Sequence, residues 1–504
     1  MNRKMQRFLR DTAVLGLASL LVRFVGIAAS RFLSGKIGDA GMGLCTLVGT
    51  VGGFAATVAT AGVGFSVTRL YPVKKARGEI RGARETVGAA LLIALGLGTL
   101  SALLLLALSG WIGASLLGNA DTVPALRVLA ASLPFMALSG ALSGYFIAVR
   151  RSRIGAVVRV GEQVLRFSLL PLLLSTLAHR GLRFSCLAVA IASGISEGVS
   201  CLFFAICFLT RLNRAAMPSL GTVGEVSATA FPMLASSLVR SGLTTLEHLL
   251  IPRALTFSGR NKTAALASYG ILASMALPIS LLPMSFLSAA TSLLVVECAE
   301  RSAGRDRTAV SELASRALSA TLTVGIGCST LLLLLGAWLS RALGGGRELC
   351  DYLYLLAPAV PLMLVDHVTD AVLRGIGEQV YSMWVNIADS ILSILLVLLL
   401  LPPLGARGYT TVILLAEIFN LSLSLGRLVR VTGVRIDLAH ALLPPLFGAL
   451  LALAFSLPLS LLGLLPALVA VVGIMSVIYA LRVAERKRKD AGGLLTKSEK
   501  TNII

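Results

Sequence analysis

The stretch TVGAALLIALGLGTLSALLLLAL, residues 86–108, carries no charged side chain over 23 consecutive residues. A helix needs about 20 apolar residues to cross a bilayer, because it rises about 1.5 Å per residue across a hydrocarbon layer of about 30 Å. This stretch is therefore predicted to be a transmembrane helix. Similar apolar stretches recur along most of the chain, so the whole sequence is interpreted as a membrane protein.

Composition supports the same interpretation. Of 504 residues, 56% are hydrophobic and 14% are charged, with a mean hydropathy of +0.88. Soluble globular proteins are about 45–50% apolar and about 25% charged. These values exclude a soluble enzyme, a disordered protein and a nucleic-acid-binding module. The net charge of +21 is assigned to the rim of a membrane protein, where it faces anionic lipid.

The pattern predicts an all-α polytopic membrane protein with about 14 transmembrane helices. The connections between them are short, so no soluble catalytic domain is expected. Within the eighth predicted span, LPISLLP (277–283) has a proline near each end, which predicts a bend. The predicted spans are 11–33, 41–68, 86–108, 123–148, 155–177, 184–209, 225–252, 264–296, 312–339, 350–373, 380–401, 408–429, 438–457 and 462–481.

Lysines and arginines between the spans predict the orientation, because cytoplasmic loops carry an excess of both. With the N-terminus inside, 29 of these residues lie in inner segments and 9 in outer segments. We therefore expect a multi-pass protein of the cytoplasmic membrane with both termini in the cytoplasm. Its basic inner face is expected to contact anionic lipids.

The chain also contains a weak internal repeat. SLLVR ending at Arg23 returns as SSLVR ending at Arg240, and Glu162 corresponds to Asp389 at a spacing of 227 residues. A duplicated unit of six spans is typical of alternating-access transporters, with the substrate site between the two copies. The predicted parts are an N-terminal lobe at 1–210, a cytoplasmic linker at 211–224, a pseudo-symmetric C-terminal lobe at 225–431, two further helices at 432–483 and a basic cytoplasmic tail at 484–504.

Two arginines within spans are candidates for substrate binding. A charge at the centre of a span costs about 2.5–3.5 kcal/mol on insertion scales and is expected to face a partner or a wet cavity. Arg23 and Arg240 occupy equivalent positions of the repeat. Two guanidinium groups that converge on a central cavity would bind a phosphate or pyrophosphate bidentately. Pairing with carboxylates elsewhere in the bundle is the alternative.

Carboxylates within spans are candidates for ion coupling or for lining the cavity. Arg166 follows Glu162 by four residues, which predicts an intrahelical ion pair. Asp389 has no such neighbour and could take up a proton. Each of the remaining candidates could equally have a structural role; they are Glu247, Asp366 and Asp370.

Enzyme signatures are absent from the sequence, which has no HExxH, no Walker motif and no GxSxG. The seven cysteines form no CxxC pair and are interpreted as small buried hydrophobes. We expect no catalytic residue, no metal and no cofactor. Transport would then be driven by H⁺ or Na⁺, by the membrane potential or by the substrate gradient.

Several motifs resemble the stage V sporulation protein B family, within the multidrug/oligosaccharidyl-lipid/polysaccharide (MOP) flippase superfamily. The resemblance implies two six-helix lobes, often with two further helices, and an undecaprenyl-pyrophosphate-linked glycan as cargo. The motifs are VRFVG…GKIGDAGMGL (22–44), AGVGFSVTRLY (61–71), GYFIAVRRSRIGAVVRVGEQVLR (144–166), SYGILASMALPISLLP (268–283), RGIGEQVYSMWVN (374–386) and LPPLGARGY (401–409).

The resemblance also bears on the arginines of the first span. Arg23 matches the early arginine of the flippase branches. Many relatives carry a second arginine two turns later, where this chain has Ser30 with Arg31 next to it. Arg31 is therefore the third candidate for binding pyrophosphate.

The sequence thus predicts a flippase that translocates a polyprenyl-pyrophosphate-linked oligosaccharide, lipid II-like or another polysaccharide precursor, for cell-wall, spore-cortex or polysaccharide synthesis. One alternative is a cation-coupled multidrug exporter of the same fold. A second is a membrane-embedded glycosyltransferase or polymerase, against which the short outer loops argue. We expect a monomer with no nucleic-acid partner.

Overall fold

The computed structural model describes residues 3–60, 62–149, 151–177, 181–210, 217–303, 307–434 and 443–451, with single positions at 454, 473 and 477. These residues form helices and turns and contain no β-strand. The predicted helix at 462–481, the tail at 484–504, much of 438–457 and part of the linker lie outside this described part. The all-helical class is confirmed.

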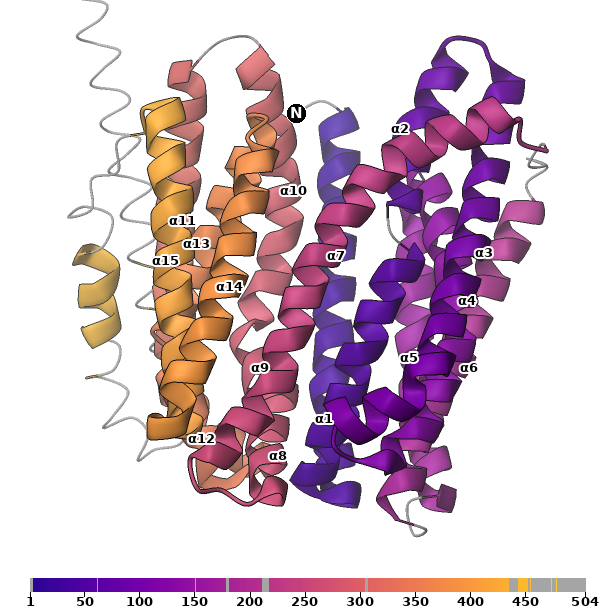
Figure 1. The fold of residues 1–504 in the computed structure, drawn as a ribbon. Coiled ribbons are helices and arrows are strands. Elements are labelled where there is room, and N and C mark those ends of the chain that lie inside the picture. Colours follow the sequence, from indigo (N-terminus) through magenta and orange to yellow (C-terminus); the bar gives the residue numbers. More distant parts are fainter. Residues whose placement is uncertain are drawn as a thin grey trace, which may run out of the picture. The chain divides into compact units, whose positions relative to one another are not determined.

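The first half of the chain forms long helices joined by short turns (Figure 1). One π-helical turn, η1 (Ile112–Leu116), ends the third helix, and one 3₁₀ turn, η2 (Ala120–Thr122), precedes the fourth. The helices are α1 (Arg3–Thr60), α2 (Val63–Ala76), α3 (Ile80–Trp111), α4 (Val123–Ala148), α5 (Ser152–Leu177) and α6 (Leu182–Leu209).

The second half begins with a long helix and contains several breaks. A π-helical turn, η4 (Leu272–Ala276), separates the eighth helix from the ninth. The helices are α7 (Leu220–Phe257), α8 (Lys262–Ile271), α9 (Leu277–Ser280), α10 (Leu282–Ala303), α11 (Arg307–Leu343), α12 (Gly346–Leu356), α13 (Ala359–Gly375), α14 (Gln379–Leu404) and α15 (Ala406–Thr432).

Nine helices of the described part are long and apolar enough to cross a membrane, or ten if α12 and α13, which meet at a bend of 51°, form one span. This count is below the predicted 14. The predicted spans 11–33 and 41–68 fall largely in one continuous candidate span, Leu20–Ala76, with a kink at Gly38 (φ 72°, ψ 166°) in place of a loop. Helices α5 and α7 are not among the candidate spans, and the last two predicted spans are largely outside the described part.

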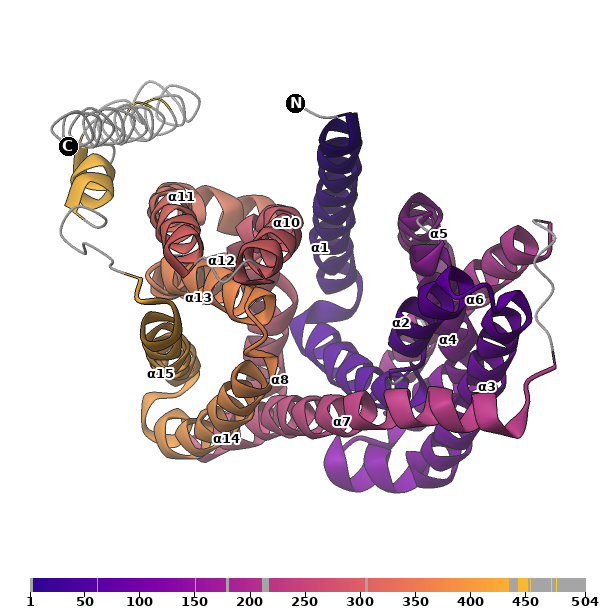
Figure 2. The same ribbon diagram turned by 90° about the horizontal axis from the view of Figure 1, so that it is seen from above.

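Contacts group the chain into two compact units. The first consists of Met1–Ala289, Leu343–Leu349 and Asn386–Val412, and the second of Ala290–Ala342, Cys350–Val385 and Ile413–Ile504. In the first unit, α7 contacts α1, α2, α3 and α8 (Figure 2). This unit therefore crosses the linker that separates the two predicted lobes. The lobe boundaries stay a prediction.

Small residues bring helices of the first unit together. A Cβ atom on Gly43 of α1 would lie 2.1 Å from the carbonyl oxygen of Leu266 on α8. A Cβ on Gly270 of α8 would lie 2.5 Å from the carbonyl oxygen of Asp39. The backbones of α1 and α8 can touch only because both positions are glycine, as is common in membrane helix pairs.

Candidate functional site

Arg23 contacts the break between α9 and α10. The bend predicted at 277–283 is confirmed, since Pro283 has no N–H to continue the helical ladder and the chain turns at Leu281. The half-buried guanidinium of Arg23 donates from Nη1 to the carbonyl oxygen of Leu281 at 2.7 Å. A guanidinium has five N–H donors, and this is the one hydrogen bond it makes within the described part. Four donors are therefore available to a ligand.

Arg240 lies in a different environment. It is exposed on α7 and forms no hydrogen bond or ion pair with any described residue. Among the described residues, no contact joins it to Arg23. Both arginines belong to the first unit. Whether they hold one ligand together stays a prediction.

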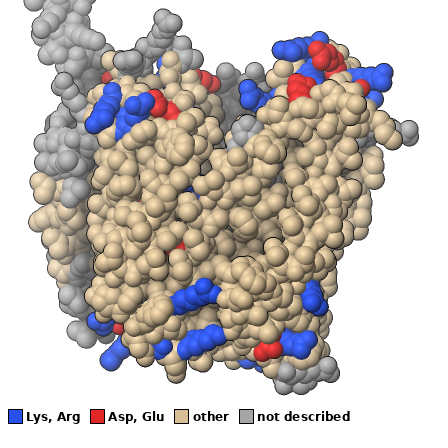
Figure 3. Space-filling view, viewed as in Figure 1, with Lys and Arg blue, Asp and Glu red and all other residues tan. Residues whose placement is uncertain are grey.

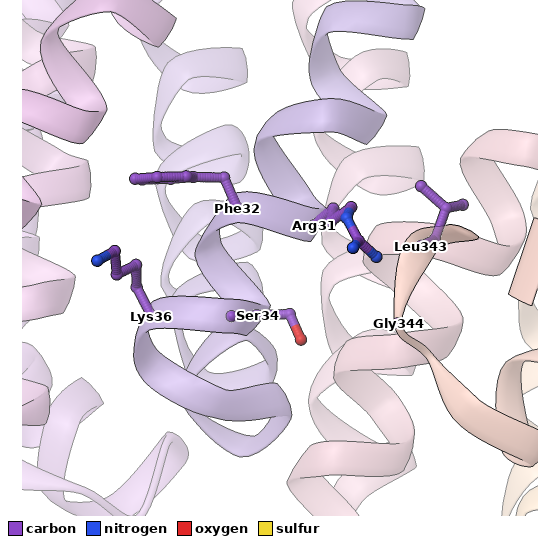
Figure 4. A pocket seen from close by; sticks show the side chains of 7 residues that line it. Arg31, Phe32, Ser34, Lys36, Leu343 and Gly344 are labelled. Atoms are coloured by element: carbon purple, nitrogen blue, oxygen red, sulfur yellow. The ribbon is translucent and has the colours of Figure 1, made fainter. Parts of the chain in front are cut away.

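Arg31 lines a pocket of about 340 Å³ formed by α1 and the turn between α11 and α12. Figure 4 shows the side chains of Arg31 and Ser34 directed toward Gly344, whereas those of Phe32 and Lys36 point to the other side of α1. Arg31 is exposed. Lys36 also lines the pocket, so two cationic residues of α1 border it from different sides of the helix.

Two carboxylates, Glu247 on α7 and Asp389 on α14, form an acidic pair in the first unit. They are close enough for their charges to interact, and Asp389 also interacts electrostatically with Arg240. The hydroxyl of Tyr409 on α15 donates to Glu247 Oε1 at 3.4 Å. Asp389 Oδ1 is buried and accepts no hydrogen bond from the described residues. Such a pair can hold a proton or a monovalent cation.

The predicted ion pair on α5 is confirmed. Arg166 Nη2 lies 2.7 Å from Glu162 Oε1, and both side chains are largely buried. Glu197 on α6 is buried and close enough to interact electrostatically with Glu162. Two carboxylates repel each other, and Arg166 offsets this repulsion because it interacts favourably with both of them.

Asp366 and Asp370 on α13, in the second unit, each accept a hydrogen bond from a different helix. Asn420 of α15 donates to Asp366 Oδ2 at 3.3 Å, and Ser382 of α14 donates to Asp370 Oδ1 at 2.6 Å. No group of three potential metal ligands occurs among the described residues. These bonds favour packing over cation binding for this pair.

Sequence reasoning missed the polar contacts between distant segments, of which the pair Lys74–Glu225 is an example. Lys74 at the end of α2 forms an ion pair of 2.5 Å with Glu225 near the start of α7. These residues are far apart in the sequence, and the charge pattern gave no signal for the pairing. Charged side chains of both signs gather over the α2–α3 turn and the start of α7 (Figure 3).

These features define a polytopic helical bundle with charged groups inside its spans, which is the architecture of a membrane transporter. The family model described as "Polysaccharide biosynthesis protein" matches residues 8–295, and the MatE model matches residues 255–399. The chain belongs to the polysaccharide biosynthesis protein family. This is not an enzyme family, which argues against the glycosyltransferase alternative.

Individual relatives are distant in sequence. Stage V sporulation protein B of Bacillus subtilis (strain 168) is 22% identical over 414 residues, which cover 80% of each chain. The lipid II flippase MurJ in an inward closed conformation is 14% identical with a TM-score of 0.71, covering 93% of this chain and 99% of that one. An inward-facing multidrug resistance MATE transporter has a TM-score of 0.64 at 17% identity, covering 83% and 98%. The solved structures show a shared fold.

Proposed function

We propose that this protein flips a polyprenyl-pyrophosphate-linked oligosaccharide across the cytoplasmic membrane by alternating access. The family supports a polysaccharide precursor as cargo. The name of the relative in Bacillus subtilis indicates a role in sporulation, and we extend the proposal to cell-wall or spore-cortex precursors.

The observation that carries the proposal is the half-buried guanidinium of Arg23. It lies within a span and contacts a break in the neighbouring helix through one of its five donors. A cation in this position needs a counter-charge, and no carboxylate of the described part pairs with it. A pyrophosphate group would supply two or more anionic oxygens in the fork geometry of the guanidinium. Arg240 and Arg31 are proposed as further contacts for the same headgroup.

The orientation, partners and assembly of the protein are part of the same proposal. The end of the first unit that carries the basic α2–α3 turn would face the cytoplasm and its anionic lipids. Both termini would lie on that side. The protein would act as a monomer, without a nucleic-acid partner, and the two predicted lobes would rock around the headgroup.

The test uses proteoliposomes that contain fluorescent lipid II, with outward exposure read by a membrane-impermeant quencher. Arg23→Gln is the informative variant, because it removes the positive charge and keeps a polar side chain that can donate hydrogen bonds. We expect Arg23→Gln and Arg240→Gln each to slow flipping at least tenfold, equivalent to about 1.4 kcal/mol. Arg347→Gln is the matched control, since this exposed arginine of α12 makes no contact with the described residues. Wild-type rates in both variants would overturn the assignment.

A cation-coupled drug exporter is the second candidate. The Glu247–Asp389 pair favours it, because a cation or proton held there could drive either cargo. The MatE match over 255–399 covers Asp389 but not Glu247. Efflux of an organic cation driven by a proton or sodium gradient, in the same proteoliposomes and without lipid II flipping, would favour this candidate.

A further inference from the structure

The start of α7 is bound to the turn between α2 and α3 by charged and polar side chains. Lys74 is 9% exposed, and its Nζ lies 2.5 Å from Glu225 Oε2. Lys74 is in the last turn of α2, and Glu225 is in the second turn of α7. Helices on either side of the predicted linker are thus joined by an ion pair at one end of the first unit.

A second contact lies beside this ion pair. Thr222 Oγ1 donates to Glu85 Oε2 of α3 at 3.2 Å, and Arg81 Nε donates to Glu85 Oε1 at 3.1 Å. Ser219 caps the N-terminus of α7 by accepting from the backbone N–H of Thr222 at 3.3 Å. The carboxylate of Glu85 lies next to the N-terminus of α7 and is stabilised by the positive end of the helix dipole. Charged side chains therefore hold the first two turns of α7 at two points, Thr222 and Glu225.

Close packing between α2 and α7 adds to these contacts. A Cβ on Gly62, where φ is +70°, would lie 2.5 Å from the carbonyl oxygen of Ala230. Ser66 of α2 is fully buried, and its hydroxyl donates to the carbonyl oxygen of Val226 at 3.4 Å. At these two positions, the described residues of α2 and α7 are in direct contact.

We propose that the Lys74–Glu225 ion pair, with the Glu85–Thr222 bond, is the inner gate of the transport path. This inference rests on the proposed function, since alternating access requires α7 to separate from α2 and α3 when cargo enters. The contacts suit a gate because Glu225 has a side chain that is already 46% exposed. Water can solvate both charges on release, so opening costs less than breaking a buried pair.

The test measures access to Ser66, which the closed gate covers. A Ser66→Cys reporter is placed in a full-length chain whose seven native cysteines are replaced, and the protein is reconstituted without cargo. The probe is a membrane-impermeant maleimide added to one side at a time. Lys74→Glu and Glu225→Lys are each expected to raise the labelling rate from one side about tenfold, equivalent to about 1.4 kcal/mol. The double swap should return the rate toward that of the parent.

The matched control is Lys75→Glu, which makes the same charge change one residue later, at an exposed lysine whose side chain forms no hydrogen bond or ion pair with a described residue. It should leave the labelling rate unchanged. The proposal is overturned if both single variants label like the parent, if Lys75→Glu raises the rate equally, or if the double swap stays as reactive as the singles. Because no cargo is present, loss of the proposed lipid II flipping would not affect this measurement, and the two proposals fail independently.

Discussion

Replacing Gly43 by alanine should force α1 and α8 apart. The new Cβ would lie 2.1 Å from the carbonyl oxygen of Leu266, whereas ordinary contacts begin at 3.4 Å, so the backbones must separate by about 1.3 Å. Overpacking of this kind costs about 1–3 kcal/mol. For a unit of this size, such a loss lowers the Tm by about 2–6 °C. The neighbour is backbone and cannot rotate away, unlike the end of a side chain.

Gly53→Ala is the matched control on the same helix, since a Cβ there would meet nothing within 4 Å. Both variants gain the same helix propensity, so their difference isolates the overpacking. Thermal unfolding in detergent can be followed by the reaction of the buried Cys45 and Cys186 with a thiol-reactive dye. Equal melting temperatures for the two variants would refute the claim that α1 and α8 touch through Gly43.

Two further substitutions test other parts of the structure. Arg427 forms a bidentate pair with Glu378 at 3.0–3.2 Å, so Arg427→Lys should lower stability by about 1 kcal/mol, measured as a lower Tm; an unchanged Tm would contradict the pairing. Glu247→Gln and Asp389→Asn should each reduce the dependence of transport on a proton or sodium gradient, measured in proteoliposomes. Asp366→Asn should not, and an equal loss in all three variants would argue against a dedicated acidic pair.

Features that depend on neighbouring residues could be predicted from the sequence. The membrane class follows from stretches such as 86–108, because burial in lipid depends only on length and composition. The Glu162–Arg166 pair follows from helical spacing, and the bend at 277–283 follows from its two prolines. The number of spans was less predictable, because a charged helix such as α7 fails a hydropathy test and because α1 bends at Gly38 where a loop was expected.

Features that join distant segments were decided by the tertiary structure alone. Arg23 and Leu281 are 258 residues apart, and nothing in either segment indicates that they meet. The same holds for Lys74 with Glu225 and for Gly43 with Leu266. In a membrane every helix face is apolar enough for lipid, so hydrophobicity does not select which faces pack together. That choice depends on where small residues let backbones touch and where buried polar groups find partners, which only the assembled helices reveal.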